Sequence, residues 1–140
     1  MKENRYKLFV SNDLKLAHKV KADGIYIPSF NKKDNFSNLG KKNILILGSA
    51  HNQKEIQTKI SQNCSAIFLS PVFRIKKSKK YLGLHRFNYL SHMNNINIFA
   101  LGGMSENNLR KLKMLNTKAF GGIRFFKKKT GLVKAGFFKD

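Results

Sequence analysis

The stretch AIFLSPVFRIKKSKKYLGL, residues 66–84, begins the pattern that decides the fold. Its first four residues are apolar and predict a buried strand, and the loop at 74–80 (the basic loop) carries five positive charges in seven residues. An amphipathic segment around Phe87 and Leu90 then predicts a helix. Strand, loop and helix in this order form the unit of parallel α/β proteins, whose chemistry lies just after the carboxyl ends of the strands.

The same unit recurs on both sides of this stretch. Apolar runs at 7–10, 25–27 and 44–47 precede it, and a strand at 97–101 and a short strand that ends at 121–124 follow it. The sequence therefore predicts an α/β fold with six strands, and each connection is long enough for a right-handed crossover. The run at 44–47 is apolar throughout, as in parallel strands that are covered on both faces.

Helix starts are marked by residues that cap free backbone N–H groups. Asn12 or Asp13 is expected to cap a helix after the first strand, and Asn52 with Glu55 three residues later resembles a capping box. Ser105 is expected to cap the helix that follows the fifth strand. These signals support helices between the predicted strands.

Length and charge limit the function classes. The chain has 140 residues, which indicates one domain but falls short of the ~250 residues of a complete eight-stranded barrel. Lys and Arg number 28 against seven acidic residues, which gives a net charge of +21. The sequence shows neither an aromatic strand platform nor a recognition helix, so nucleic acid is an unlikely partner. The surplus charge fits a lysine-rich solvent surface and equally a pull on phosphorylated small molecules.

Cysteine content and hydropathy suggest where the protein acts. Cys64 is the single cysteine, so no intrachain disulfide forms, and we interpret it as a small packing residue. No apolar run approaches the ~20 residues of a membrane span, and Met1 does not begin a signal peptide. We therefore expect a cytoplasmic protein.

Two glycines and an arginine form a candidate phosphate site. Gly102-Gly103 follows a strand and precedes a helix, where a backbone without side chains can approach a phosphate. Arg124 follows the last strand and has the geometry to clamp the same anion. The alternatives are a tight turn for the glycines and a solvated side chain for Arg124.

Four segments, in order, resemble the thiamine-phosphate synthase and thiazole tautomerase superfamily of (β/α)8 barrels. They are LA at 16–17 with ADGIYI at 22–27, GSAHN at 48–52, FLSPVF at 68–73 with LGL at 82–84, and IFALGGM at 98–104. The resemblance covers residues 8–126 and implies family strands three to eight, which make an incomplete (β/α)8 barrel of the TIM type. It implies a partial barrel at 1–126, followed by a basic tail at 127–140. We interpret the tail as the remnant of a closing helix, although Gly131 and Gly136 weaken a helix there.

The resemblance also implies site residues. It places Ser78 and Lys79 where the family stabilises a leaving pyrophosphate, which makes them the candidate catalytic residues. The further candidates for phosphate binding are Ser49, Ser70, Gly102, Gly103 and Arg124. We interpret His51, at the end of the third strand, as a structural residue of the rim.

The family's magnesium site is only partly matched. The resemblance implies Mg²⁺ as cofactor, with Asp13 as candidate ligand, although ungapped alignment places Ser11 and Asn12 at the family's Asn-Asp pair. Asn31 stands where a metal-binding Asp is expected, and Arg124 replaces a phosphate-binding serine. The family's first two strand–helix units have no counterpart, so the chain is either a fragment or a shortened relative.

The implied activity joins hydroxymethylpyrimidine pyrophosphate to thiazole phosphate and releases pyrophosphate. The alternatives are a thiazole tautomerase and a degenerate phosphate-binding relative without catalysis. Because charge-stabilising groups are missing, we expect slow turnover or none. Open sheet edges before the first and after the sixth strand predict a homodimer or a missing N-terminal segment that covers the gap.

Overall fold

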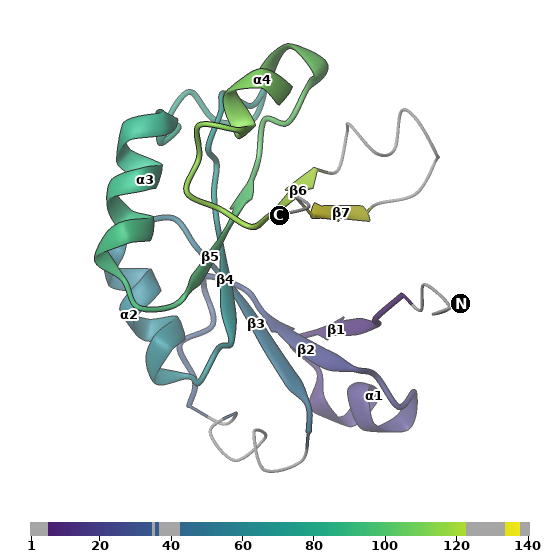
Figure 1. The fold of residues 1–140 in the computed structure, drawn as a ribbon. Coiled ribbons are helices and arrows are strands. Elements are labelled where there is room, and N and C mark those ends of the chain that lie inside the picture. The colour runs from purple at the N-terminus through teal and green to yellow at the C-terminus, as the bar shows by residue number, and fades with distance from the viewer. Residues whose placement is uncertain (1–5, 35, 37–42, 123–133, 138–140) are drawn as a thin grey trace.

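One curled sheet organises the molecule (Figure 1). The computed structural model describes residues 6–34, 36, 43–122 and 134–137. Seven strands pair in sequence order, and the first six run parallel, as the sequence predicts. The strands are β1 (Phe9–Ser11), β2 (Gly24–Ile27), β3 (Leu45–Ala50), β4 (Ala66–Leu69), β5 (Asn97–Leu101), β6 (Ala119–Gly122) and β7 (Lys134–Phe137).

The helices lie outside the arc of the sheet, so the fold is an incomplete (β/α) barrel (Figure 1). They are α1 (Leu14–Lys19), α2 (Gln53–Ser61), α3 (Gly83–Met93) and α4 (Leu109–Leu112), the last preceded by the 3-10 helix η2 (Glu106–Asn108). Within the described residues, no helix has the length and apolar character that crossing a membrane requires.

The main core fills the space between the sheet and the helices. Ile67 of β4, Ile46 of β3 and Phe87 of α3 are buried in one apolar cluster. Because side chains alternate along a strand, Phe68 points to the opposite, concave face. There its ring lies 5.5 Å from that of Phe99, centroid to centroid, and the three-strand stack continues to Tyr26 at 6.4 Å.

Two of the three predicted caps form hydrogen bonds. Asp13 Oδ1 accepts from Leu16 N at 2.9 Å, and Asn52 Oδ1 accepts from Glu55 N at 3.0 Å. Ser105 precedes η2 without a side-chain cap bond. The Glu55 carboxylate accepts from the backbone N–H of His51, one residue before the cap, so the Asn52 motif differs from a strict capping box.

The tail differs from our expectation. We expected the remnant of a helix, whereas Lys134–Phe137 forms β7 and pairs antiparallel with β6. The interpretation as a helix is wrong for residues 134–137, which form a strand although Gly136 weakens a strand as it weakens a helix. The edge of β6 is therefore covered, and the described sheet ends at β1 and β7.

Helix α3 provides a matched pair of aromatic residues for a stability test. Phe87 is 0% exposed and Tyr89, two residues later, is 64% exposed. We expect Phe87→Ala to lower the free energy of unfolding by about 3–5 kcal/mol, because it removes a buried ring and leaves a cavity. Tyr89→Ala should change it by less than about 0.5 kcal/mol. Urea unfolding followed by circular dichroism checks both values, and equal losses would contradict this placement of the core.

Candidate functional site

The loops after β1 to β5 emerge at one edge of the sheet, because parallel strands end on the same side. We call this the C-terminal edge. Ser49 is the penultimate residue of β3. Ser70 directly follows β4, and Gly102-Gly103 follow β5. The structure thus brings these candidates to one edge, as predicted. Arg124 lies outside the described residues.

The two glycines make a tight contact with the loop after β4. Gly102 and Gly103 have φ of +95° and +73°, which favours glycine. A Cβ on Gly103 would lie 2.6 Å from the carbonyl oxygen of Phe73, and one on Gly102 would lie 2.9 Å from Cα of Pro71. Backbone packing alone therefore requires both glycines, and a valine at Gly103 would strain the fold in addition to any effect on an anion.

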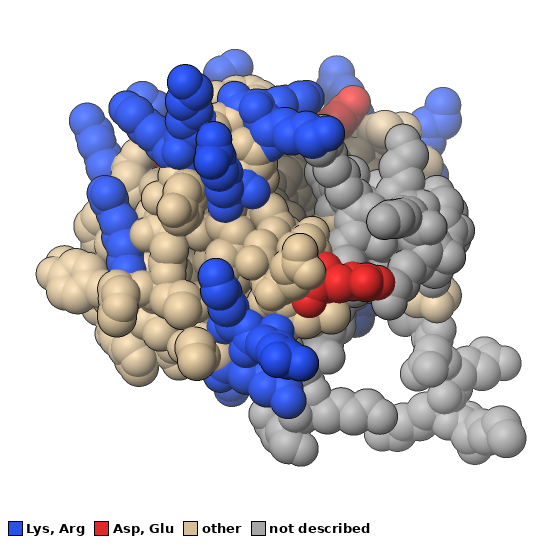
Figure 2. Space-filling model, turned by 90° about the horizontal axis from the view of Figure 1, so that it is seen from above, with Lys and Arg blue, Asp and Glu red and all other residues tan. Residues whose placement is uncertain are grey.

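The basic loop is a compact turn with exposed lysines. Ser78 Oγ donates to Lys80 O at 3.1 Å and accepts from Lys80 N at 3.2 Å, so this hydroxyl holds the turn. Lys79 is exposed and extends from the same turn. On the face from which α4 projects, Lys and Arg side chains far outnumber acidic ones (Figure 2). The loop offers charge to an anion more readily than it offers the Ser78 hydroxyl.

His51 joins three loops at the C-terminal edge. Its Nδ1 lies 2.8 Å from the carbonyl oxygen of Ser70, and its Nε2 lies 3.2 Å from Ser29 Oγ. Because a carbonyl only accepts, His51 donates from Nδ1 to Ser70 O, and Ser29 Oγ lies within hydrogen-bond distance of Nε2. These bonds confirm the interpretation of His51 as a structural residue of the rim. The part played by Ser29 was missed, since it has no signal in the sequence.

Ser49 and Ser70 differ in access. Ser49 is 7% exposed and pairs in register with Phe68, so it belongs to the packed concave face. Ser70 is half-buried, with its hydroxyl 3.3 Å from His51 Nδ1. An anion at this edge would reach Ser70 more easily than Ser49.

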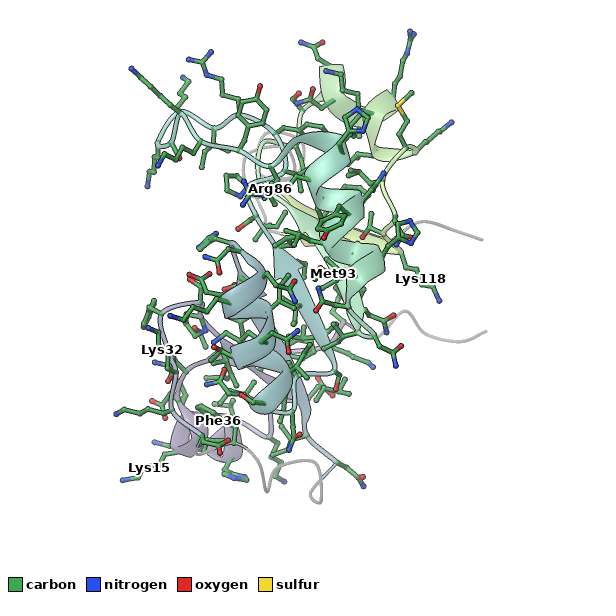
Figure 3. The ribbon with its side chains drawn as sticks, turned by 90° about the vertical axis from the view of Figure 1, so that its left-hand side faces the viewer. Lys15, Lys32, Phe36, Arg86, Met93 and Lys118 are labelled. Atoms are coloured by element: carbon green, nitrogen blue, oxygen red, sulfur yellow. The ribbon has the colours of Figure 1, made fainter. Side chains whose placement is uncertain are left out.

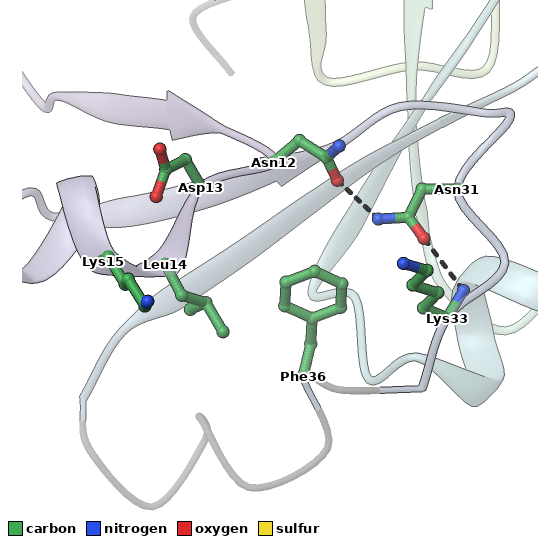
Figure 4. A pocket seen from close by; sticks show the side chains of 7 residues that line it. All are labelled: Asn12, Asp13, Leu14, Lys15, Asn31, Lys33 and Phe36. Atoms are coloured by element: carbon green, nitrogen blue, oxygen red, sulfur yellow. Dashed lines mark hydrogen bonds between the residues drawn. The ribbon is translucent and has the colours of Figure 1, made fainter.

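A cleft of about 300 Å³ separates the loops after β1 and β2 (Figure 4). The side chains of Asn12 and Asn31 meet in it, where Asn31 Nδ2 donates to Asn12 Oδ1 (the amide pair). Asn31 Oδ1 accepts from Lys33 N at 2.9 Å. Asp13 also lines the cleft, and one of its oxygens caps α1.

The described residues do not fit a magnesium site. Mg²⁺ prefers carboxylate oxygens, and the amide pair uses its oxygens for internal hydrogen bonds. The described part of the chain contains no group of three or more His, Cys, Asp or Glu residues able to hold a metal ion. Among the described residues that line the cleft, Asp13 is the one carboxylate, and it also serves as a helix cap.

A buried polar cluster holds the loop of Asn31 from behind. Lys59 of α2 is 0% exposed, and its Nζ donates to Asn31 O at 2.7 Å and to Gln62 Oε1 at 2.9 Å. Gln62 Nε2 donates to Asn31 O at 3.0 Å and to Lys33 O at 2.7 Å. The sequence reasoning missed this cluster, although Lys59 lies three residues after Ile56 and so shares the buried face of α2.

Burial perturbs two groups at this cluster. It lowers the pKa of the Lys59 ammonium, while the neighbouring Cys64 and Glu55 act against the shift. It raises the pKa of the Cys64 thiol to about 11, and Lys59 acts against that shift. Cys64 is buried, which confirms its interpretation as a packing residue.

Comparison with known proteins identifies the family of this chain. A profile described as thiamine monophosphate synthase matches residues 1–124, which is most of the chain. The chain belongs to that family. The match spans the segments at 16–27, 48–52, 68–84 and 98–104, which carry the resemblance in the sequence.

Relatives in the thiamine monophosphate synthase family are longer than this chain. A thiamine-phosphate synthase of Prochlorococcus marinus strain SARG is 33% identical over 118 residues, which cover 79% of this chain and 33% of that protein. A thiamine-phosphate synthase of Methanococcus vannielii is 31% identical over 112 residues, which cover 76% of this chain and 52% of that protein. The solved structure of thiamine phosphate pyrophosphorylase from Pyrococcus furiosus shares the fold, with a TM-score of 0.62, 21% identity, and coverage of 76% of this chain and 52% of that one.

The buried thiol predicts a pH dependence of stability. The thiol pKa is about 11 in the folded protein and 9.0 ordinarily, so the unfolded chain ionises first. Its contribution to stability is complete below pH ~9 and is lost as the pH rises through ~11. Over this range we expect the unfolding free energy of the wild type to fall relative to that of Cys64→Ala by roughly 2–3 kcal/mol.

Chemical denaturation of both proteins at a series of alkaline pH values measures this difference. Lys59 remains buried in both proteins, and its lowered pKa acts in the opposite direction, so comparing the two removes most of its effect. A difference that stays constant from neutral to alkaline pH would contradict the burial of the thiol.

Proposed function

We propose that this chain binds phosphorylated small molecules at its C-terminal edge and acts in thiamine-phosphate synthesis. The reaction would join hydroxymethylpyrimidine pyrophosphate to thiazole phosphate and release pyrophosphate. The observation that carries the proposal is the family match over residues 1–124, together with a basic loop at the edge where parallel α/β proteins bind ligands. The tautomerase and the degenerate relative have no comparable support.

The basic loop would stabilise the leaving group. The bond between the pyrimidine methylene and pyrophosphate breaks, the leaving oxygen keeps the electron pair, and the methylene carbon bonds to the thiazole nitrogen. Lys79 is exposed and has the charge to meet the pyrophosphate as its negative charge grows. Ser78 would act by holding the turn that presents Lys79, since its hydroxyl bonds to Lys80. No covalent nucleophile is required.

The remaining candidates would contact phosphate groups. Ser70 is the best placed, because it is half-buried at the edge and contacts His51 in the loop after β3. Gly102 and Gly103 would offer backbone N–H groups, and Arg124 a guanidinium, to the thiazole phosphate. Ser49 would act from the concave wall. These assignments rest on the family resemblance and on the shared edge. A cytoplasmic location is proposed from the family alone.

Turnover is expected to be slow. Asn31 stands where the family resemblance implies a metal-binding carboxylate, and it is engaged with Asn12. The loss of one well-placed charge-stabilising group typically costs about 10²–10³ in rate. We therefore expect a kcat well below the ~10 s⁻¹ of a typical enzyme. A kcat near that value, measured as thiamine phosphate formed from both substrates, would contradict this expectation.

Substitution of Lys79 tests the role of the basic loop. Lys79→Ala should weaken the binding of hydroxymethylpyrimidine pyrophosphate by about tenfold, because it removes a charge-assisted contact. Lys118→Ala is the matched control, since Lys118 is also exposed but precedes β6 at the opposite edge (Figure 3). Isothermal titration calorimetry measures both affinities. If the two variants bound equally tightly, the basic loop would have no part in recognition.

The concave face implies a further partner for the sheet. Phe68 and Phe99 are only half-buried there, whereas barrel interiors are filled by side chains from all strands. A second copy, or further strands of the family barrel, would cover these rings. We expect a dimer in sedimentation velocity experiments, and a monomer that stays monodisperse at high concentration would contradict a second copy as the cover.

A further inference from the structure

The cleft between the loops after β1 and β2 lies at the C-terminal edge but lacks the chemistry of a cation site. Its base is the amide pair, a neutral group whose two oxygens already accept hydrogen bonds from Asn31 Nδ2 and Lys33 N. An oxygen that accepts from an N–H group has less electron density to offer a metal. The Asp13 carboxylate points away from the amide pair (Figure 4), and one oxygen caps α1.

Lysine side chains supply the positive charge around this cleft. Of the described lining residues, Lys15 and Lys33 are positively charged and Asp13 alone is negatively charged. The Lys33 side chain extends toward the space between Phe36 and the amide pair (Figure 4). The local charge therefore attracts an anion and opposes a divalent cation. This is the reverse of the carboxylate-rich surroundings that Mg²⁺ requires.

The buried cluster fixes the amide pair in this arrangement. Lys59 and Gln62 both donate to the backbone oxygen of Asn31, and Gln62 also donates to that of Lys33. Three hydrogen bonds from buried side chains thus hold the two residues that face the cleft. Asn12 is fixed from the other side, because its backbone N–H donates to Tyr26 O at 2.9 Å. A preorganised site of this kind loses little entropy when an anion binds.

We propose that this cleft binds the pyrophosphate group directly, with the Lys33 ammonium and the amide N–H groups of Asn12 and Asn31 in place of a divalent cation. The proposal rests on the proposed function, since it specifies how the anion of that reaction is held. Asn12 Nδ2 is turned away from Asn31 (Figure 4), so its N–H groups are directed outward from the amide pair. A lysine ammonium serves as a point charge for phosphate without any metal.

The first experiment titrates the full chain with inorganic pyrophosphate by calorimetry, once in EDTA and once in excess MgCl2. We expect binding in EDTA to be at least as tight as in MgCl2, because magnesium complexes the free anion and contributes nothing at the cleft. Binding seen only in MgCl2 would overturn this inference and leave the proposed function intact. Binding in neither condition would overturn both.

A matched pair of lysine variants locates the site. Lys33→Ala should weaken metal-free pyrophosphate binding by about tenfold or more. Lys32→Ala is the control, because Lys32 is also exposed but does not line the cleft (Figure 3). Equal affinities of the two variants would place the anion elsewhere and overturn the inference.

A carboxylate at position 31 should reverse the effect of magnesium on pyrophosphate binding. Asn31→Asp keeps the size of the side chain, and the Asn12 amide can turn to donate to it. The new charge should abolish metal-free binding of pyrophosphate and make binding depend on MgCl2. Thermal unfolding by circular dichroism verifies that the variant is folded. A folded Asn31→Asp protein that binds pyrophosphate in EDTA as tightly as the wild type would contradict the proposal.

Discussion

Parallel pairing in sequence order is the constraint on which the rest of the structure depends. Six strands that run the same way are joined by five crossovers, and the helices in these crossovers lie on one face of the sheet. The same constraint places the carboxyl ends of these six strands at one edge of the sheet, so that loops far apart in sequence become neighbours. Asn12 meets Asn31 and Ser29 meets Ser70 through His51 for this reason.

Most of the fold could be predicted from apolar runs and capping residues. The strands at 44–47 and 66–69 are apolar throughout, and burial on both faces selects that pattern. Asp13 and Asn52 marked helix starts because their side chains satisfy free backbone N–H groups. The tail was misread, because glycines at 131 and 136 weaken a helix and a strand alike, so local propensity does not decide between them.

The candidate site was predictable at the level of segments and less so at the level of contacts. Gly102 and Gly103 were found because a strand–glycine–helix pattern is local in sequence. The pairing of Asn12 with Asn31 was not, since it depends on the register of two strands and on the path of a long loop. Lys59 shows the same limit, because a lysine on a helix normally faces solvent, and its burial follows from the carbonyl groups of another segment.

The lengths of the two outermost strands have a consequence for how the protein behaves in a crowded solution. Within the described residues β1 has three residues and β7 has four, so each described strand offers only a short row of hydrogen-bonding groups to another chain. Templated growth into fibres uses segments of about six or seven residues, which is longer than either strand. An encounter through these strands would therefore gain few hydrogen bonds, and lasting association would have to come from burial of apolar surface. The described edge strands are therefore poor templates for fibril growth, whereas the aromatic concave face offers apolar surface that a partner could bury.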